Sequence, residues 1–341
     1  MENNALINGD CMIKIAVDVM GGDYAPHEII KGSIDGARKY NTAVILVGSN
    51  NVIQNELNQY DISGLSIEIV HTDEFLIEGE SPAFAIRNKS NSSIMLCVKL
   101  VPDGKADAVI SAGPTGGLVA SAVHILGTFE GISRPVIGGP FMGFAPNTIL
   151  FDIGSNIDSH PEQLLDFALM GTVYADKIMG IEKPTVALAS VGSEEGKGNK
   201  VVRETYELLK KSGLNFIGNI EGNDIVRGKV NVVICDGFVG NILLKFSEGL
   251  SIAVTDWLAG KLSQKLSGEE LSKITVELRN CIRTTSQSEV ILYGVNGIIC
   301  KAHGNSRAQD FSNIIAMAKN AVESDVVNKL RTGLLSIRSN K

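Results

Sequence analysis

A glycine-rich segment with two hydroxyl side chains, residues 111–117, lies between a short apolar run and a stretch typical of a helix beginning near Leu118. Free backbone N–H groups at the first turn of a helix bind anions such as phosphate. The glycine spacing is not that of a dinucleotide-binding turn. We therefore predict an anion-binding turn, with ordinary turn chemistry as the alternative. Its expected contacts are Ser111, Gly113, Thr115 and Gly116.

Two further turns carry carboxylates after apolar runs. In the first, glycines that permit close backbone approach stand between two acids, and the expected ligand contacts are Asp18, Gly22 and Asp23. The alternative for this turn is a tight bend with structural acids. In the second, Asp152 and Asn156 are expected to complete the same anion pocket from the strand next to the 111–117 turn.

Lys197 lies among glycines in the segment 192–200. This segment superficially resembles a nucleotide phosphate loop, but the glycines are one residue too close, no Ser or Thr follows the lysine, and two acids precede it. A nucleotide site is therefore disfavoured. A lysine among glycines at a strand end suits the stabilisation of developing negative charge.

Asn241 and His303 are the remaining candidates for chemistry. Asn241 stands near the start of a predicted helix, where it is either an N-cap or a donor to an oxyanion. His303 lies between Lys301 and a glycine turn, where a histidine is either catalytic or a hydrogen-bonding fixture.

The elements that position these residues alternate between strands and helices, as in α/β proteins. Short apolar runs typical of buried parallel strands alternate with helical stretches, which predicts a doubly wound sheet covered by helices on both faces. Ligands bind such sheets beyond the carboxyl ends of the strands. The predicted strands are 13–19, 42–47, 65–70, 108–110, 148–151, 185–190, 215–218 and 230–235, and the predicted helices include 26–40, 93–101, 161–179 and 200–212.

The region of about 241–283 does not show this alternation of strands and helices. It is helical with little strand signal, and a strand pattern returns at 290–301. It predicts a protruding helical hairpin. We expect a disordered leader over 1–11 and a single α/β/α domain over 12–335.

Composition excludes several classes of function. The net charge of -7 disfavours nucleic acid, and the five cysteines are too scattered for a zinc site or a disulfide framework. No metal or cofactor motif stands out. No apolar run approaches the roughly 20 residues of a membrane span, and no secretory signal is visible, so we expect a cytoplasmic protein.

Taken together, the ordered motifs resemble the phosphate acyltransferase family of bacterial phospholipid synthesis, the PlsX family, over about residues 13–329. The most specific pieces are 18–26, 194–199, 236–245 and 294–304. Two positions depart from the family pattern. Pro114 stands where Asn is usual and removes one backbone donor and one amide, and Ser155 replaces the usual Ala and adds a hydroxyl.

The resemblance implies transfer of a fatty acyl group from acyl carrier protein to inorganic phosphate, giving acyl phosphate. It also implies a three-layer α/β/α fold related to phosphotransacetylases and the isocitrate dehydrogenase class, a homodimer, and no metal or nucleotide cofactor. The expected catalytic residues are Lys197, Asn241 and His303, and the matching segments add Asn199, Asp236, Lys245 and Lys301 as substrate contacts.

Other functions remain open from the sequence. One is a phosphotransacetylase acting on short acyl-coenzyme A, and another is a non-catalytic sensor of lipid or carrier protein on the same fold. A nicotinamide dehydrogenase is disfavoured because the dinucleotide fingerprint is missing.

The hairpin region also predicts partner contacts. An acidic carrier protein needs a basic face, for which the candidates are Lys261, Lys265, Lys273, Arg279 and Arg283. A stripe of Trp257, Leu258 and Leu262 beside lysines suits peripheral contact with an anionic membrane. The alternative is that this stripe is buried in a dimer interface or against the main body.

Overall fold

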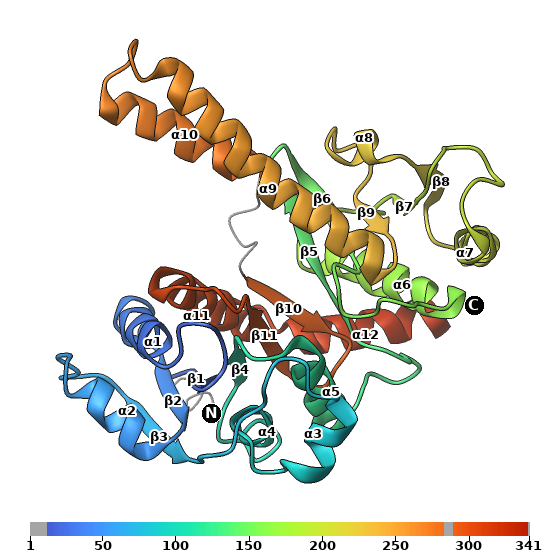
Figure 1. Ribbon diagram of the computed structural model, residues 1–341. Helices are drawn as coiled ribbons and strands as arrows, with labels where there is room; N and C mark the ends of the chain where they lie inside the picture. Colours follow the sequence, from blue (N-terminus) through green and yellow to red (C-terminus); the bar gives the residue numbers. More distant parts are fainter. Residues whose placement is uncertain (1–11, 283–288, 340–341) are drawn as a thin grey trace, which may run out of the picture. The chain divides into compact units, whose positions relative to one another are not determined.

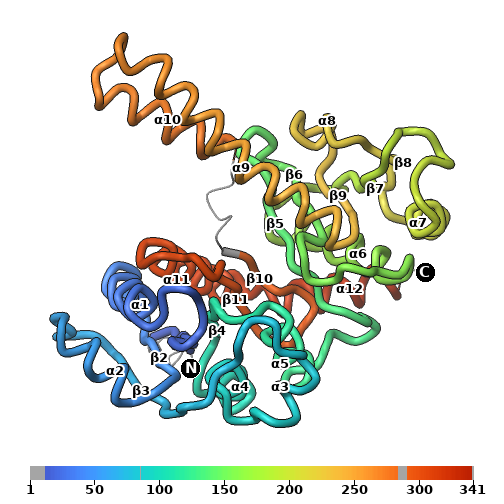
Figure 2. Tube along the Cα trace, in the orientation of Figure 1, coloured from blue at the N-terminus to red at the C-terminus, as the bar shows by residue number. Residues whose placement is uncertain are grey.

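The computed structural model describes residues 12–282 and 289–339. The expected leader over 1–11 and the candidate Arg283 lie outside these residues. The chain divides into two compact units, of which unit 1 comprises residues 1–126 and 297–324 and unit 2 comprises residues 127–296 and 325–341. Figure 2 shows how the late segment containing α11 (Ala308–Glu323) returns to lie beside α1 (His27–Tyr40) in unit 1.

Unit 1 is built on five parallel strands in the order β3 (Ile67–His71), β2 (Ala43–Gly48), β1 (Lys14–Asp18), β4 (Ala108–Ser111) and β11 (Ile298–Ala302), drawn in Figure 1. Every residue of β2, β4 and β11 is buried, which is why these strands read as continuous apolar runs. The register pairs Ser111 with both Asp18 and Lys301, so the last residue of β1 and of β4 meets the penultimate residue of β11.

Helices cover both faces of this sheet. Helix α1 packs on α11, while α4 (Ser93–Lys99) packs on α5 (Thr115–Leu126) at the other face. Helix α2 (Asn50–Leu57) lies along β3, and α3 (Pro82–Asn88) lies beside α5. The contact of α1 with α11 requires glycine, because a Cβ at Gly32 would lie 2.3 Å from the carbonyl oxygen of Ala308.

Unit 2 contains the strands β10 (Glu289–Tyr293), β5 (Val136–Met142), β6 (Ala145–Phe151), β9 (Val232–Ile234), β7 (Val186–Ala189) and β8 (Phe216–Ile220), in that order. The β5–β6 hairpin and the β10–β5 pair are antiparallel, which corrects the expectation of parallel strands here. Strand β5 was not predicted, because its Gly138, Gly139 and Pro140 are residues typical of turns.

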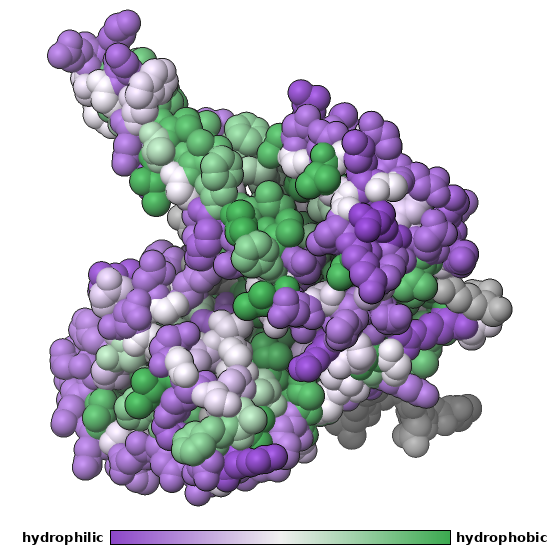
Figure 3. Space-filling model, turned by 45° about the vertical axis from the view of Figure 1, so that its right-hand side comes forward, coloured by the Kyte–Doolittle hydropathy of each residue, from purple (hydrophilic) through white to green (hydrophobic). Residues whose placement is uncertain are grey.

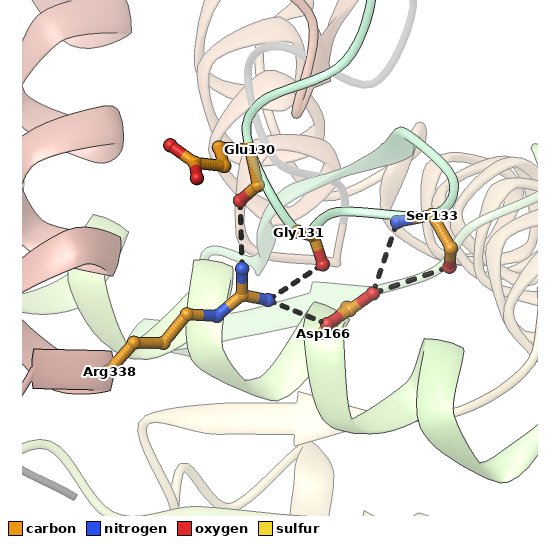
Figure 4. Close-up of polar contacts among 5 residues, drawn as sticks. All are labelled: Glu130, Gly131, Ser133, Asp166 and Arg338. Atoms are coloured by element: carbon orange, nitrogen blue, oxygen red, sulfur yellow. Dashed lines mark hydrogen bonds and ion pairs between the residues drawn. The ribbon is translucent and has the colours of Figure 1, made fainter.

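Helix α6 (Pro161–Lys177) packs on β6 and β9, and α12 (Val326–Ser339) packs on α6. Helix α7 (Lys200–Lys210) lies beside β8, and α8 (Gly222–Ile225) is a single turn. Figure 4 shows the contact that fixes the end of α12: Arg338 donates to the Glu130 and Gly131 carbonyl oxygens at 2.8 Å each and to Asp166 Oδ1 at 3.1 Å. Asp166 Oδ2 accepts from Ser133 at 3.3 Å.

Helices α9 (Gly237–Leu262) and α10 (Gly268–Ile282) pack on each other as a hairpin, as predicted. Asp236 caps α9 by accepting a hydrogen bond from the Val239 N–H at 2.8 Å. Asn241 therefore lies inside the helix, and the N-cap alternative for it is wrong. By length and composition alone, α9 is apolar enough to cross a membrane, contrary to the expectation for the chain. Core helices of soluble proteins have the same property, so this assigns no span.

The predicted α/β fold is confirmed, with helices on both faces of the unit 1 sheet. Most predicted elements match observed ones within a few residues, and α5 begins at Thr115 rather than near Leu118.

Candidate active site

A cavity of about 430 Å³ lies in unit 1 beyond the carboxyl ends of β1, β4 and β11. This volume is within the range typical of small-molecule sites. The lining includes six of the residues that the sequence predicted, namely Gly22, Asp23, Gly113, Thr115, Lys301 and His303. The remaining lining residues are Met20, Gly21, Phe75, Leu76, Ile77, Glu78, Ala112, Pro114 and Gly304.

One wall of the cavity is the start of α5. The first N–H groups of a helix have no intrahelical acceptor, and here they belong to Thr115 and the two glycines after it. Pro114 contributes no N–H, but its carbonyl oxygen accepts from the Leu118 N–H at 3.0 Å and closes the first helical turn. Partial positive charge at this helix end favours an anion in the cavity.

Asp18 lies beneath this wall and is completely buried. Its Oδ2 accepts a hydrogen bond from the Ser111 hydroxyl at 2.6 Å, and its Oδ1 accepts from the Met20 N–H at 3.1 Å. Ser111 in turn accepts from the Gly113 N–H at 3.0 Å. Burial raises the pKa of Asp18, and these hydrogen bonds oppose that rise. Asp18 and Ser111 thus support the turns around the cavity, and neither lines it.

The turns approach one another so closely that glycine is required. A Cβ at Gly21 would lie 2.5 Å from the Gly113 nitrogen, and Gly22 has a φ of +104°. The Asp23 N–H donates to the Gly304 carbonyl oxygen at 2.7 Å, which joins the first turn to the turn after β11. Three segments far apart in sequence thus form one cavity wall.

Lys301 and His303 bring the functional groups of β11 and its turn to the cavity. Lys301 is buried, and its amino group donates to the Ala112 carbonyl oxygen at 3.4 Å and to that of Ala302. A buried ammonium beside a helix N-terminus makes the cavity attractive to an anion. Among the described residues there is no cluster of side chains suited to a metal ion.

The predicted residues of unit 2 form different contacts. The side chain of Asp152 accepts five hydrogen bonds from residues 154–156, including one from the Asn156 amide at 2.8 Å, so both side chains hold their own turn. Strand β6, which precedes Asp152, is not a neighbour of β4 in the sheet. The expectation that these residues follow the strand next to β4 was therefore wrong, and their contact with a ligand stays a prediction.

Three other predicted contacts in unit 2 have local partners. Asn199 caps α7 by accepting from the Val202 N–H at 2.9 Å, and Asp236 caps α9. Lys245 pairs with Glu248 at 2.8 Å on the exposed side of α9.

Lys197 and Asn241, also in unit 2, are both exposed. Within the described residues the Lys197 amino group has no hydrogen bond or ion pair. Asn241 lies next to Gly154, where an added Cβ would be 3.4 Å from the Asn241 amide oxygen. Both side chains are therefore available to a ligand.

The segment 75–78, which lines the cavity with Phe75, Leu76 and Ile77, was not predicted from the sequence. Its apolar residues follow neither helical nor strand periodicity and stand between acids, so they gave no element signal.

The comparisons with known proteins agree with this architecture. Residues 13–329 match the model of a protein family described as "Fatty acid synthesis protein". A phosphate acyltransferase of Desulforamulus reducens is 40% identical over 326 residues, covering 95% of this chain and 98% of the relative. One from Pelotomaculum thermopropionicum is 42% identical over 333 residues, covering 95% and 96%.

Two solved structures share the fold. A phosphotransacetylase of Streptococcus pyogenes aligns with a TM-score of 0.61 at 20% identity, covering 92% of this chain and 95% of the other. A branched-chain phosphotransacylase of Enterococcus faecalis aligns with a TM-score of 0.53 at 14% identity, covering 91% and 100%. Given the full-length match to its relatives, this chain belongs to the phosphate acyltransferase family of fatty acid synthesis proteins.

Proposed function

We propose that this chain is an enzyme that transfers a fatty acyl group from acyl carrier protein to inorganic phosphate and so supplies acyl phosphate for phospholipid synthesis. The names of its full-length relatives support this activity. The observation that carries the proposal is the unit 1 cavity, where Lys301 and the first N–H groups of α5 favour an anion beside an apolar wall.

The reaction needs no activated protein nucleophile. A phosphate oxygen attacks the carbonyl carbon of the thioester, and the carbon–sulfur bond breaks as the tetrahedral intermediate collapses. The carrier thiolate leaves and takes a proton. Holding phosphate next to the thioester supplies much of the rate, because a well-oriented pair avoids the entropy cost of a bimolecular encounter.

We assign phosphate binding to the 113–116 turn and Lys301, and we place His303 beside the reacting atoms because it lines the same cavity. Lys197 and Asn241 are the proposed donors to the oxyanion, on the chemical ground that one ammonium and one amide are exposed and have no hydrogen-bond partner within the described part of the chain. Such a donor contributes about 3 to 4 kcal/mol to transition-state stability in known cases.

We further propose a cytoplasmic homodimer with peripheral membrane contact. Helix α9 exposes large apolar side chains along its length, and Figure 3 shows apolar surface gathered along the hairpin. The exposed set on this helix is Phe238, Val239, Ile242, Phe246, Leu250, Ile252 and Trp257. An exposed apolar stripe of this size favours a second apolar surface, either a copy of the chain or lipid.

Carrier protein is assigned to the basic residues of the hairpin. Lys261 and Lys265 are exposed. Lys273 pairs with Glu269 at 2.7 Å, and Arg279 approaches the Thr255 hydroxyl at 3.5 Å. We therefore expect Lys261, at the end of α9, and Lys265, just beyond it, to contribute more to docking than the residues of α10.

The test is to mix the purified chain with palmitoyl-acyl carrier protein and inorganic phosphate and to detect acyl phosphate by trapping with hydroxylamine. Acetyl-coenzyme A replaces the acyl carrier protein in a parallel reaction. We expect product from the first mixture and at least tenfold less from the second. Product from acetyl-coenzyme A alone would identify the chain as a phosphotransacetylase. No product from either mixture would favour the non-catalytic sensor of lipid or carrier protein.

A further inference from the structure

The cavity of unit 1 is lined by two chemically different sets of groups. One set is the start of α5, Lys301 and His303, and the other is the segment 75–78, which we call the strap. Leu76 of the strap is buried, whereas the side chains of Phe75 and Ile77 are 39% and 54% exposed. The strap ends in the carboxylate of Glu78, which also lines the cavity, so its apolar part is Phe75, Leu76 and Ile77. An apolar stretch beside an anion site suits a molecule with a charged head and an apolar tail.

The strap is held in place by side chains outside it. Lys89 donates to the Phe75 carbonyl oxygen at 3.1 Å and to Glu80 Oε1 at 2.6 Å, while Glu80 Oε2 accepts from the Ile77 N–H at 3.2 Å. This clip satisfies backbone groups at two points of the strap. The positions of Phe75 and Ile77 are thus fixed although the segment belongs to no helix or strand.

Leu76 attaches the strap to the anion wall. Its side chain packs on the first turn of α5 so closely that a Cβ at Gly117 would lie 2.6 Å from Leu76 Cδ1. Leu76 is buried in this packing, while Phe75 and Ile77 on either side of it stay exposed, and all three line the cavity. The packing of one leucine therefore presents two apolar groups beside the phosphate contacts.

We propose that Phe75 and Ile77 bind the acyl chain of the substrate and set a preference for long chains, an inference that rests on the proposed acyl transfer. The occupant is the part of the chain beyond its first few carbons, because these side chains share one cavity with the helix start that favours phosphate. A longer chain continues outward across the exposed face of Ile77. A short acyl group reaches the anion wall without needing either side chain.

The first experiment measures binding without turnover. Dodecyl phosphate and inorganic phosphate are titrated by calorimetry into the full chain and into the Phe75→Ala and Ile77→Ala variants. Each substitution is expected to weaken dodecyl phosphate about tenfold, since the loss of a few methylene contacts has that effect, and to change inorganic phosphate less than twofold. Ile62→Ala is the matched control, because Ile62 is 36% exposed in the same unit and does not line the cavity.

The second experiment compares kcat/KM for butyryl- and palmitoyl-acyl carrier protein. The strap variants are expected to lose about tenfold with palmitoyl and little with butyryl. Equal losses for both chain lengths, or equal weakening of dodecyl phosphate and inorganic phosphate, would overturn the inference. Phe75 and Ile77 are both exposed, so their replacement should leave the fold intact. Because the two variants are independent, the test still stands if one of them misfolds. Absence of turnover in the unmodified chain would reject the proposed function, while the calorimetric comparison would still decide the role of the strap.

Discussion

The Ser111 hydroxyl donates a 2.6 Å hydrogen bond to Asp18 Oδ2 and accepts one from the Gly113 N–H, so a carboxylate that does not line the cavity fixes the turn that does. Ser111→Ala breaks both bonds. Leaving a buried hydrogen-bonding group without its partner costs about 1 to 3 kcal/mol, and we expect part of this cost as a KM for phosphate raised about tenfold. Initial rates against phosphate concentration give this constant.

The control for this substitution is Ser121→Ala. Ser121 is equally buried in α5, and its hydroxyl has no hydrogen-bond partner within the described residues. A KM for phosphate that rises to the same extent in both variants would mean that loss of any buried hydroxyl in this unit has the effect, and would contradict the positioning role.

Asp18 also gives a prediction for pH. Burial raises its folded-state pKa above the value of the unfolded chain, so the folded state binds the proton more tightly. The contribution of Asp18 to folding stability is fully present below the pKa that this residue has in the unfolded chain. It is lost as the pH rises through the higher pKa of Asp18 in the folded protein. The melting temperature of the wild type minus that of Asp18→Asn should therefore fall as pH rises from about 4 toward neutrality. A difference that grows with pH would show that the hydrogen bonds outweigh burial.

The sequence predicted most elements because buried parallel strands and amphipathic helices have strong local patterns. It did not predict which strands are neighbours, since β4 pairs with β11 across almost two hundred residues of chain, and that pairing places Lys301 beside Ser111. Strand β5 was not predicted because Gly138, Gly139 and Pro140 are residues typical of turns. Of the candidate residues, only ones at the ends of β1, β4 and β11 line the cavity, whereas the role of the aperiodic Phe75 depends on contacts that no local pattern records.

Lys197→Ala is expected to lower kcat by about two orders of magnitude, because that is the usual loss when one oxyanion donor is removed. The side chain is exposed and has no hydrogen bond or ion pair among the described residues, so the melting temperature should change little. Near-normal turnover in a folded protein would remove Lys197 from the chemistry. Lys200→Ala, a change to an exposed lysine on the following helix, is the control.

Asn241→Ala and Asp236→Ala separate catalysis from capping. Asp236 caps α9, so its removal should cost about 1 kcal/mol of unfolding free energy. Asn241 is inside the helix, where alanine is a better helix former, and its substitution should lower turnover without destabilising the fold. Chemical denaturation and steady-state kinetics on both variants test this. If Asn241→Ala alone lost stability and kept normal turnover, Asn241 would have a structural role and no role in catalysis.

Arg338→Ala removes the only group in Figure 4 that brings positive charge to Asp166. Asp166 is mostly buried, and burial already raises its pKa, so without the guanidinium its carboxylate is less favourable still. We expect a loss of about 1 to 3 kcal/mol of unfolding free energy. Lys329→Ala, an exposed change on the same helix, should have little effect, and equal losses in the two variants would argue against the contact.

Trp257 decides between lipid and a second copy of the chain as the partner of α9. Its side chain is 64% exposed, and the lysines at positions 261 and 265 follow on the same helix or just beyond it, an arrangement suited to an anionic membrane surface. Trp257→Glu should abolish sedimentation with phosphatidylglycerol vesicles and leave both soluble activity and oligomer mass unchanged. Phe144→Glu is the control, because Phe144 is 54% exposed between β5 and β6. A shift to monomer mass in Trp257→Glu would assign the stripe to a dimer interface, since a buried charge opposes association there.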